Sequence, residues 1–137
     1  MRLGGTRRVG PSISETPLMK SILIVDDVRD IAEATAEVFS TLGYRAQTAF
    51  DGREAVDAVH RACPDIVLLD IHMPGLDGLD AAREIRTKYP GHPPVLIALS
   101  AVVHFHSDDE LQACGFDHAL TKPADIDELV RIIEEAG

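Results

Sequence analysis

Three short, nearly continuous runs of apolar residues place the strongest constraint on how this chain can fold. They span residues 21–25 (Ser-Ile-Leu-Ile-Val), 66–69 (Ile-Val-Leu-Leu) and 95–99 (Val-Leu-Ile-Ala-Leu). Runs of this kind suit strands that are buried on both faces, as in parallel sheets covered by helices. Residues 44–50 and 116–120 are weaker, more polar candidates, as expected of strands near a sheet edge. Together, the five segments predict a parallel sheet.

Apolar residues at helical spacing separate these strands. They form four groups: Ile31, Thr35, Val38, Phe39 and Leu42; Val56, Val59 and Cys63; Leu79, Ala82, Ile85 and Tyr89; and Ile126, Leu129, Val130 and Ile133. Gly43 is predicted to end the first helix. Three residue pairs are typical of helix N-caps: Asp51 with Glu54, Ser107 with Glu110, and Asp125 with Glu128. The alternation of strands and helices predicts a doubly wound α/β domain with helices on both faces of the sheet.

The start of the fourth helix has two interpretations. The Ser107 and Glu110 pair favours a late start near residue 107, which leaves residues 101–106 as a long loop. The register of similar domains instead places Ser107 inside the helix. The late start is the preferred interpretation.

Polar residues follow four of the predicted strands. Asp26 and Asp27 come after the first strand, Asp70 after the third, Ser100 after the fourth and Lys122 just past the fifth. In open α/β sheets, ligands bind beyond the carboxyl ends of the strands, where the strand order reverses. The five side chains are therefore predicted to converge on one crevice.

Three neighbouring carboxylates repel each other, and a cation relieves that repulsion. Oxygen ligands with room for water favour Mg²⁺. Asp27 and Asp70 are predicted to bind the ion directly, Asp26 directly or through water, and the backbone carbonyl of His72 could supply another oxygen. The His72 side chain either hangs over the site or lies exposed at its rim. Asp26 and Asp27 could alternatively cap the following helix.

Asp70 is the candidate nucleophile, because carboxylates can form acyl phosphates. Lys122 would add a second positive centre beside the metal, and the Ser100 hydroxyl could donate a hydrogen bond to the phosphate. Pro123 follows the lysine, and a cis peptide in a tight turn there would aim the ammonium inward.

Four motifs resemble those of the response-regulator receiver domain, which accepts phosphate from histidine kinases in two-component signalling. They are Ile-Val-Asp-Asp (24–27), Leu-Leu-Asp-Ile-His-Met-Pro-Gly-Leu-Asp-Gly (68–78), Leu-Ser-Ala (99–101) and Leu-Thr-Lys-Pro (120–123). Each motif alone is a weak signal, but four in the family's order and spacing are a strong one. The resemblance runs from about Lys20 to the C-terminus.

The resemblance implies a flavodoxin-like five-stranded sheet in the order 2-1-3-4-5. It also implies that Asp26 and Asp27 bind Mg²⁺, that Asp70 accepts the phosphoryl group, and that Ser100 and Lys122 contact it. The expected partners are a histidine kinase or histidine phosphotransfer protein, an unknown downstream protein, and a second copy of the chain through the fourth and fifth helices. The domain would be no enzyme beyond its own phosphorylation and dephosphorylation.

One position departs from the family pattern. Many receivers carry an aromatic residue three positions before the lysine, and this chain has Ala119 there. Signal output is then expected to depend on Ser100, the loop after it and the last two helices, with Phe105 as a speculative substitute for the aromatic residue.

Composition narrows the function. The 137 residues allow one domain, and the net charge of −10 argues against nucleic-acid binding. The longest apolar stretch, residues 95–103, falls short of the roughly 20 residues that a membrane helix needs. Cys63 and Cys114 make no disulfide framework, so the cytoplasm is the expected location.

The first nineteen residues differ from the rest. Arg2, Arg7 and Arg8 against Glu15 give them a charge of +2, which leaves −12 for the remainder of the −10 total. Gly, Pro, Ser and Thr are frequent there. Residues 1–19 are therefore predicted to be a flexible tail, and residues 20–137 the receiver domain.

Two other function classes are weaker. A hydrolase of the haloacid dehalogenase type needs Asp-x-Asp after its first strand, whereas Asp26 and Asp27 are adjacent and followed by Val28. A phosphorylation-independent interaction domain usually lacks an acidic or lysine position, and none is missing here. A stand-alone receiver is preferred over one excised from a larger kinase or regulator.

Overall fold

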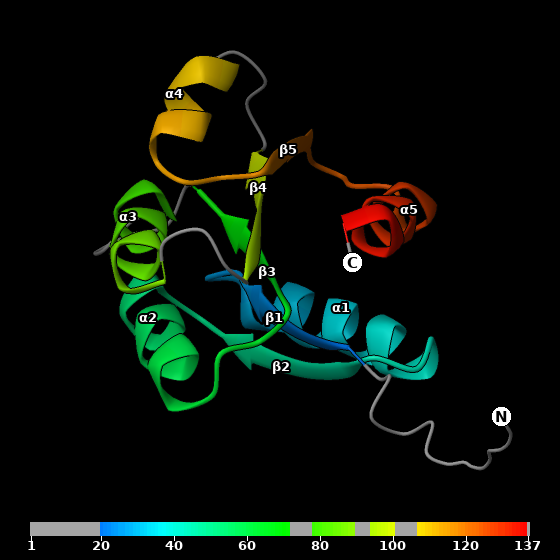
Figure 1. Cartoon of the computed structure of the whole chain (residues 1–137). Coiled ribbons are helices and arrows are strands. Elements are labelled where there is room, and N and C mark those ends of the chain that lie inside the picture. Colours follow the sequence, from blue (N-terminus) through cyan, green and yellow to red (C-terminus); the bar gives the residue numbers. More distant parts are fainter. Residues whose placement is uncertain (1–19, 72–77, 90–93, 101–106, 137) are drawn as a thin grey trace, which may run out of the picture.

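Five parallel strands form one sheet in the order β2-β1-β3-β4-β5 (Figure 1). The computed structural model describes residues 20–71, 78–89, 94–100 and 107–136. The strands are β1 (Ser21–Val25), β2 (Arg45–Ala49), β3 (Ile66–Asp70), β4 (Val95–Ser100) and β5 (His118–Thr121). The predicted sheet, its order and its three central strands are confirmed.

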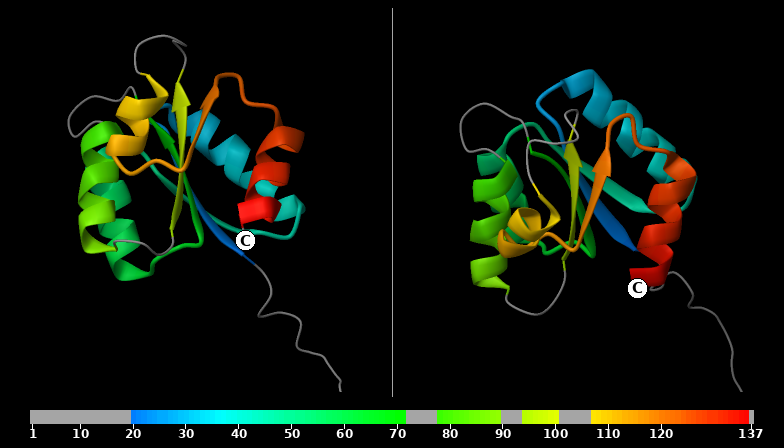
Figure 2. Two further views of the ribbon diagram at one scale, coloured as in Figure 1. Left: turned by 45° about the horizontal axis from the view of Figure 1, so that its top comes forward. Right: turned by 90° about the horizontal axis from the view of Figure 1, so that it is seen from above.

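Helices cover both faces of this sheet. They are α1 (Arg29–Thr41), α2 (Gly52–Arg61), α3 (Gly78–Lys88), α4 (Asp108–Ala113) and α5 (Ile126–Ala136). Helices α2, α3 and α4 lie on one face, and α1 and α5 on the other (Figures 1 and 2). The predicted doubly wound arrangement is therefore correct.

The central strands divide their side chains between two hydrophobic cores. Leu23 of β1 faces the core under α2 and α3, whereas its neighbours Ile22 and Ile24 face the core under α1 and α5. The same alternation runs along β3, where Leu68 and Leu69 are fully buried in opposite cores. Because both faces are covered, the interior positions of these strands are apolar, and the sequence shows no alternation between apolar and polar residues.

Side-chain caps begin three helices. The Asp51 carboxylate accepts a hydrogen bond from the Glu54 amide at 2.7 Å, and the Ser107 hydroxyl accepts one from the Glu110 amide at 3.1 Å. Both pairs satisfy backbone donors at a helix start. Because Ser107 is the N-cap of α4, the predicted late start of this helix is confirmed.

The third predicted cap differs in detail. The Asp125 carboxylate accepts from the Asp127 amide at 3.0 Å, one residue earlier than in the predicted pairing with Glu128. Gly43 follows the end of α1 with a φ of 99°, as predicted for the residue that stops this helix.

The apolar stripe predicted for α1 is buried only in part. Ala32 and Phe39 are its buried residues, whereas Ile31, Val38 and Leu42 are 48%, 41% and 50% exposed. Alanines let the helix approach the sheet closely, and the Phe39 ring packs edge-on against a tyrosine of the same core at 5.4 Å between centroids. The larger apolar residues consequently form an exposed stripe along the helix, and Ile31 within it faces α5 across a surface pocket.

The described helices are each too short or too polar to cross a lipid bilayer. Residues 1–19, predicted to be a flexible tail, lie outside the described part of the chain, as do the loop predicted at residues 101–106 and Phe105 within it. The division of the chain at residue 20 stays a prediction.

Candidate functional site

Three carboxylates meet at the carboxyl end of the sheet. Asp26 and Asp27 follow β1, and Asp70 is the last residue of β3, which pairs with β1. Each side chain offers an oxygen, and these oxygens all lie within 4.8 Å of one another. Asp26 and Asp70 are buried, at 3% and 6% exposure, whereas Asp27 is exposed. The predicted convergence of these residues is observed.

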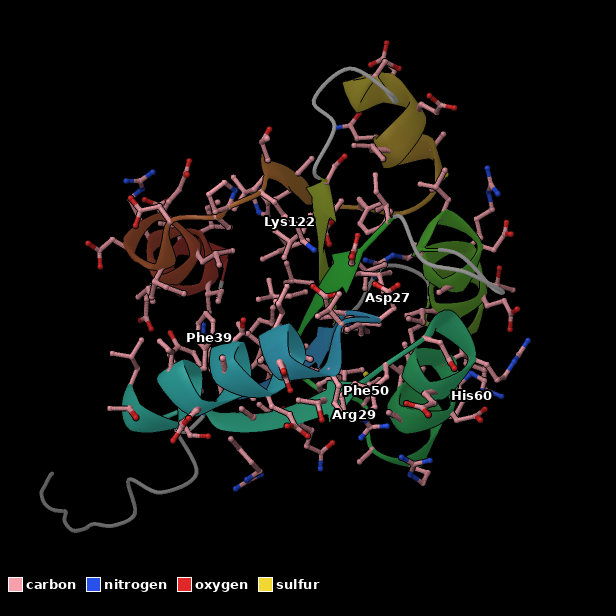
Figure 3. All side chains as sticks on the ribbon, turned by 180° about the vertical axis from the view of Figure 1, so that it is seen from behind. Asp27, Arg29, Phe39, Phe50, His60 and Lys122 are labelled. Carbon is pink, nitrogen blue, oxygen red and sulfur yellow. The ribbon has the colours of Figure 1, made fainter. Side chains whose placement is uncertain are left out.

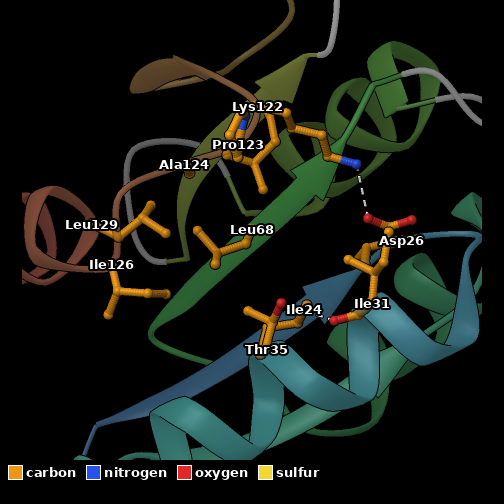
Figure 4. Close-up of a pocket in the computed structure, with 12 residues that line it drawn as sticks. Ile24, Asp26, Ile31, Thr35, Leu68, Lys122, Pro123, Ala124, Ile126 and Leu129 are labelled. Carbon is orange, nitrogen blue, oxygen red and sulfur yellow. Dashed lines mark hydrogen bonds and ion pairs between the residues drawn. The ribbon is translucent and has the colours of Figure 1, made fainter.

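Lys122 completes the charge cluster. Its ammonium donates to Asp26 Oδ2 at 2.8 Å and to Asp70 Oδ2 at 3.0 Å (Figure 4 shows the first pair). Burial lowers the pKa of this ammonium, but the hydrogen bonds and charges of the two carboxylates outweigh that effect, so the pKa of Lys122 is raised above its ordinary value. The Lys122–Pro123 peptide bond is cis, in agreement with the hypothesis drawn from the sequence.

Asp26 also fixes the turn into α1. Its Oδ1 accepts a hydrogen bond from the Val28 amide at 2.9 Å, just before the helix begins at Arg29. Val28 itself is the N-cap and makes no side-chain cap bond. Asp26 therefore supports the start of the helix and belongs to the carboxylate cluster at the same time, which combines the two interpretations drawn from the sequence.

The start of α1 is also held against the end of β2. The Arg29 guanidinium carbon lies 3.9 Å from the centroid of the Phe50 ring, a cation–π contact that Figure 3 shows near Asp27. Because Arg29 follows Asp27 by two residues, this contact helps to place the exposed carboxylate at the rim of the site.

Ser100 lies at the same edge as the charge cluster. It is the half-buried last residue of β4, in register with Thr121 of β5. Its carbonyl accepts from the Lys122 amide at 2.8 Å, which ties the backbone of the hydroxyl residue to that of the lysine. The structure thus brings together Asp26, Asp27, Asp70, Ser100 and Lys122. The backbone carbonyl of His72 lies outside the described residues.

Ala119 is exposed on β5. It lines a surface pocket together with Leu111 of α4 and Phe116 before β5. No aromatic side chain can act from this position, as the sequence already indicates.

Gly78 is a residue of the site that the sequence interpretation missed. It is the first residue of α3, and a Cβ atom there would overlap the Cα atom of Ile71 and lie 2.6 Å from the carbonyl oxygen of Asp70. The absence of a side chain lets α3 start directly against the backbone of Asp70. Its sequence signal was its place as the last residue of the motif at 68–78, where turn chemistry explains a glycine equally well.

The donor set fits a hard divalent cation. Three carboxylate oxygens in this spacing match the oxygen ligands that Mg²⁺ prefers, and the exposure of Asp27 leaves room for the waters that this ion retains. The three carboxylates also outnumber the Lys122 ammonium, so the cluster favours a further positive charge. Asp26, Asp27 and Asp70 are therefore the residues that could hold the ion.

Comparison with known proteins identifies a family to which the chain belongs. Residues 22–134 match the family model of the response regulator receiver domain. The response regulator TrrA from Thermotoga maritima, solved in complex with Mg²⁺-BeF, is 38% identical to the chain at a TM-score of 0.76. The match covers 85% of this chain and 98% of TrrA.

Two further solved structures are similar. The receiver domain of a sensor histidine kinase from Pseudomonas aeruginosa PAO1, with a magnesium ion coordinated in its active site cleft, is 32% identical at a TM-score of 0.76. That match covers 85% of this chain and 96% of the other. The chemotaxis protein CheY4 from Vibrio cholerae is 26% identical at a TM-score of 0.78, over 85% of this chain and 98% of its own.

Proposed function

Because the chain belongs to the response regulator receiver domain family, we propose that it accepts a phosphoryl group on Asp70 and signals through phosphorylation-dependent binding of another protein. The observation that carries this proposal is the cluster of three carboxylates in direct contact with Lys122. The similarity extends over 98% of the TrrA and CheY4 chains and over 96% of the receiver domain of a sensor histidine kinase, so the proposal holds for a stand-alone receiver and for one within a larger protein. Cytoplasmic phosphodonors and Mg²⁺ would make the cytoplasm its place of action.

Asp70 is the carboxylate best suited to be the nucleophile. Asp26 has both oxygens engaged, Oδ1 by the Val28 amide and Oδ2 by the Lys122 ammonium. Asp27 is exposed and suits a ligand that shares an ion with water. Asp70 ends the central strand β3 and lies between the acidic pair and Lys122.

In the proposed step, a carboxylate oxygen of Asp70 forms a bond to the phosphorus atom of the donor. The bond from phosphorus to the leaving atom breaks, and that atom, a histidine nitrogen or an acetate oxygen, keeps the electron pair. Bound Mg²⁺ would neutralise charge on the phosphoryl oxygens. The Lys122 ammonium already lies 3.0 Å from Asp70 Oδ2, so it is placed to pair with a phosphoryl oxygen there. The Ser100 hydroxyl could donate to another.

Intact-mass analysis after incubation with Mg²⁺ and acetyl phosphate tests the proposal. We expect one phosphoryl adduct on the wild-type protein, and none without Mg²⁺ or in Asp70→Asn. Asp57→Asn is the matched control, because Asp57 is an exposed aspartate on α2 away from the site. An adduct that persists in Asp70→Asn would show that a residue other than Asp70 accepts the phosphoryl group. Its absence from the wild-type protein, together with a failure to bind beryllofluoride, would favour a phosphorylation-independent binding domain.

The outer face of α1 supports a protein as the phosphodonor. All the exposed large apolar residues of the described chain, Val28, Ile31, Val38 and Leu42, belong to α1 and the residues that flank it. At about 100° per residue they share one stripe, which begins directly after Asp27. We propose that a helix of a histidine kinase or histidine phosphotransfer protein packs on this stripe and brings its phosphohistidine to Asp70.

A comparison of donors tests this docking surface. In Val38→Glu, we expect phosphoryl transfer from a panel of histidine kinases and phosphotransfer proteins to slow by about tenfold or more, because the charge must be desolvated at the interface. The rate with acetyl phosphate should be unchanged. Ala62→Glu, exposed at the end of α2 on the other side of the sheet, is the control. Equal slowing with both kinds of donor would contradict the docking role.

A further inference from the structure

A cavity of about 410 Å³ lies between α1 and α5, beside the charge cluster (Figure 4). Its accessible apolar lining includes Ile31 of α1, Ile126 of α5 and Pro123, and the buried side chains of Ile24, Leu68 and Leu129 lie behind them. Asp26 and Lys122 lie at one end, joined by their 2.8 Å ion pair. A mainly apolar hollow with a few polar groups at one end is the usual form of a small-molecule site, and its size is within the range of such sites.

Helix α5 forms one wall of this cavity and is hydrogen-bonded to other parts of the fold near its C-terminal end. The residues of α5 that line it, Ile126 and Leu129, belong to the first part of the helix. Near its other end, Glu134 accepts a hydrogen bond from the Tyr44 hydroxyl at 2.8 Å, and the Ile133 carbonyl accepts one from the Lys20 ammonium at 3.1 Å. The C-terminal part of α5 is therefore held by hydrogen bonds, and its N-terminal part lines the cavity.

The charges at the polar end select the kind of ligand. Asp26 lines the cavity, and the oxygens of Asp27 and Asp70 lie within 4.8 Å of its own. Lys122 is the cation paired with this group. Three carboxylates around one ammonium attract a further positive charge and repel an anion. Each carboxylate oxygen can accept about two hydrogen bonds, so Asp26 can take another donor beside those from Val28 and Lys122.

We propose that this cavity binds a small organic cation, with a compact apolar body against Ile31, Pro123 and Ile126 and an ammonium group directed at Asp26. The site is separate from the phosphoryl-transfer function and needs no phosphodonor. Because its charged end shares Asp26 with the carboxylate cluster, the organic cation and Mg²⁺ weaken each other's binding. Thermodynamic linkage makes this effect equal in both directions.

A matched pair of probes tests the proposal on the wild-type protein. 4-Phenylbutylamine carries the ammonium, and 4-phenylbutan-1-ol has the same shape without the charge. We expect chemical-shift changes of isoleucine and leucine methyl groups around the cavity with both probes, and binding of the amine that is tighter by about fivefold or more at low salt. Added Mg²⁺ should weaken the amine and leave the alcohol unchanged.

Two threonine variants locate the site. Thr35 lines the cavity and donates its hydroxyl only to the Ile31 carbonyl of its own helix, at 2.8 Å, so Thr35→Phe should fill the hollow. Thr41 makes the same kind of bond on α1, to Glu37 at 3.0 Å, but lies exposed outside the cavity. We expect Thr35→Phe to lose binding of both probes and Thr41→Phe to retain it.

Two outcomes would overturn the inference: equal affinity for amine and alcohol, or binding by Thr35→Phe that matches Thr41→Phe. The wild-type comparison of the two probes stands even if a variant fails to fold. The binding assay uses no phosphodonor, so its failure is distinguishable from a failure of Asp70 to become phosphorylated.

Discussion

Lys122 contacts the same carboxylates that would hold the proposed divalent cation. The ammonium contacts Asp26 and Asp70, both of which are buried and would otherwise repel each other. Breaking a buried ion pair by removing one partner leaves an uncompensated charge, which is strongly destabilising. The lysine is therefore a structural counter-charge of the resting site as well as a candidate contact of the phosphoryl group.

Lys122→Met tests how much the lysine and Mg²⁺ each stabilise the carboxylate cluster. Without Mg²⁺, we expect the free energy of unfolding to fall by about 3 kcal/mol, because two buried carboxylates lose their cation. Mg²⁺ should then raise the melting temperature of the variant by more than that of the wild type, since the ion meets no competing ammonium. Differential scanning calorimetry with and without MgCl₂ measures both effects.

Lys88→Met is the control for this substitution, because Lys88 is exposed in the last turn of α3. Its melting temperature should stay close to that of the wild type. If Lys122→Met melted at the same temperature as Lys88→Met in the absence of Mg²⁺, the ion pairs of Lys122 would contribute nothing measurable to stability.

The charged residues of the site were predictable for a local reason. Asp26, Asp70 and Lys122 each stand at or just past the end of a strand, and the topology of parallel strands brings those ends together. Gly78 was not predictable in the same way. Its role arises from a close approach between α3 and the backbone of Asp70, and such tertiary contacts leave no periodic signal in the sequence.

Among the elements, α3 depends most directly on a single residue for its position. Gly78→Ala would place a methyl group 2.6 Å from the Asp70 carbonyl oxygen, so the helix or the strand must shift. We expect a loss of about 1–3 kcal/mol in unfolding free energy, as for other overpacked sites. The shift should also slow phosphorylation by acetyl phosphate, because it moves the nucleophile.

Chemical denaturation and intact-mass time courses measure these two effects of Gly78→Ala. Asp80→Ala is the control in the same helical turn, because Asp80 is exposed and its ion pair with Arg83 is a surface pair of little expected weight. If the unfolding free energy of Gly78→Ala equalled that of the wild type, α3 could move away from Asp70 without a loss of stability.

Helix α5 is tied to the sheet through the hydrogen bond from Tyr44 to Glu134. Burial, this hydrogen bond and the charge of Glu134 together raise the pKa of Tyr44 to about 12. The folded state therefore holds the phenolic proton more tightly than the unfolded state, whose pKa is about 10. The resulting stabilisation is fully present below about pH 10 and is lost as the pH rises toward about 12.

Glu134→Gln should lower the pKa of Tyr44 toward its ordinary value, because the carboxylate charge disappears. Titration of the tyrosine absorbance in a Tyr89→Phe background, which leaves one tyrosine in the chain, measures the shift. Glu135→Gln, at the neighbouring exposed position, should leave the pKa at about 12. Identical titrations of the two variants would mean that burial alone sets the value.

The first helix shows where prediction of elements from sequence stops. Its bounds and its ending at Gly43 were predictable, because they depend on local spacing and backbone conformation. Its orientation was not, since the large residues Ile31 and Val38 suggested an inner face that the sheet does not accept. The small residue Ala32 allows closer packing, and only the tertiary structure shows which of the two faces is buried.

For the whole molecule, the net charge of −10 makes repulsion between like charges a general term in stability. Sodium chloride should raise the melting temperature modestly by screening that repulsion. At equal ionic strength, magnesium chloride should raise it further, because binding at a hundred times the dissociation constant adds about 2.7 kcal/mol. Asp27→Asn should remove most of this extra gain. Thermal melts in the two salts measure these effects. An equal rise in melting temperature in sodium chloride and magnesium chloride would argue against a specific ion site.

The division of the interior by the sheet has a consequence for protein engineering. Leu69 and Ile85 pack in the core under α2 and α3, whereas the cavity beside Lys122 opens into the opposite core. Changes at distant sites without shared partners usually add independently. A designer can therefore repack or stabilise the α2–α3 side while keeping the chemistry of the α1–α5 side as a fixed module, and can graft a different reactive edge onto the same scaffold.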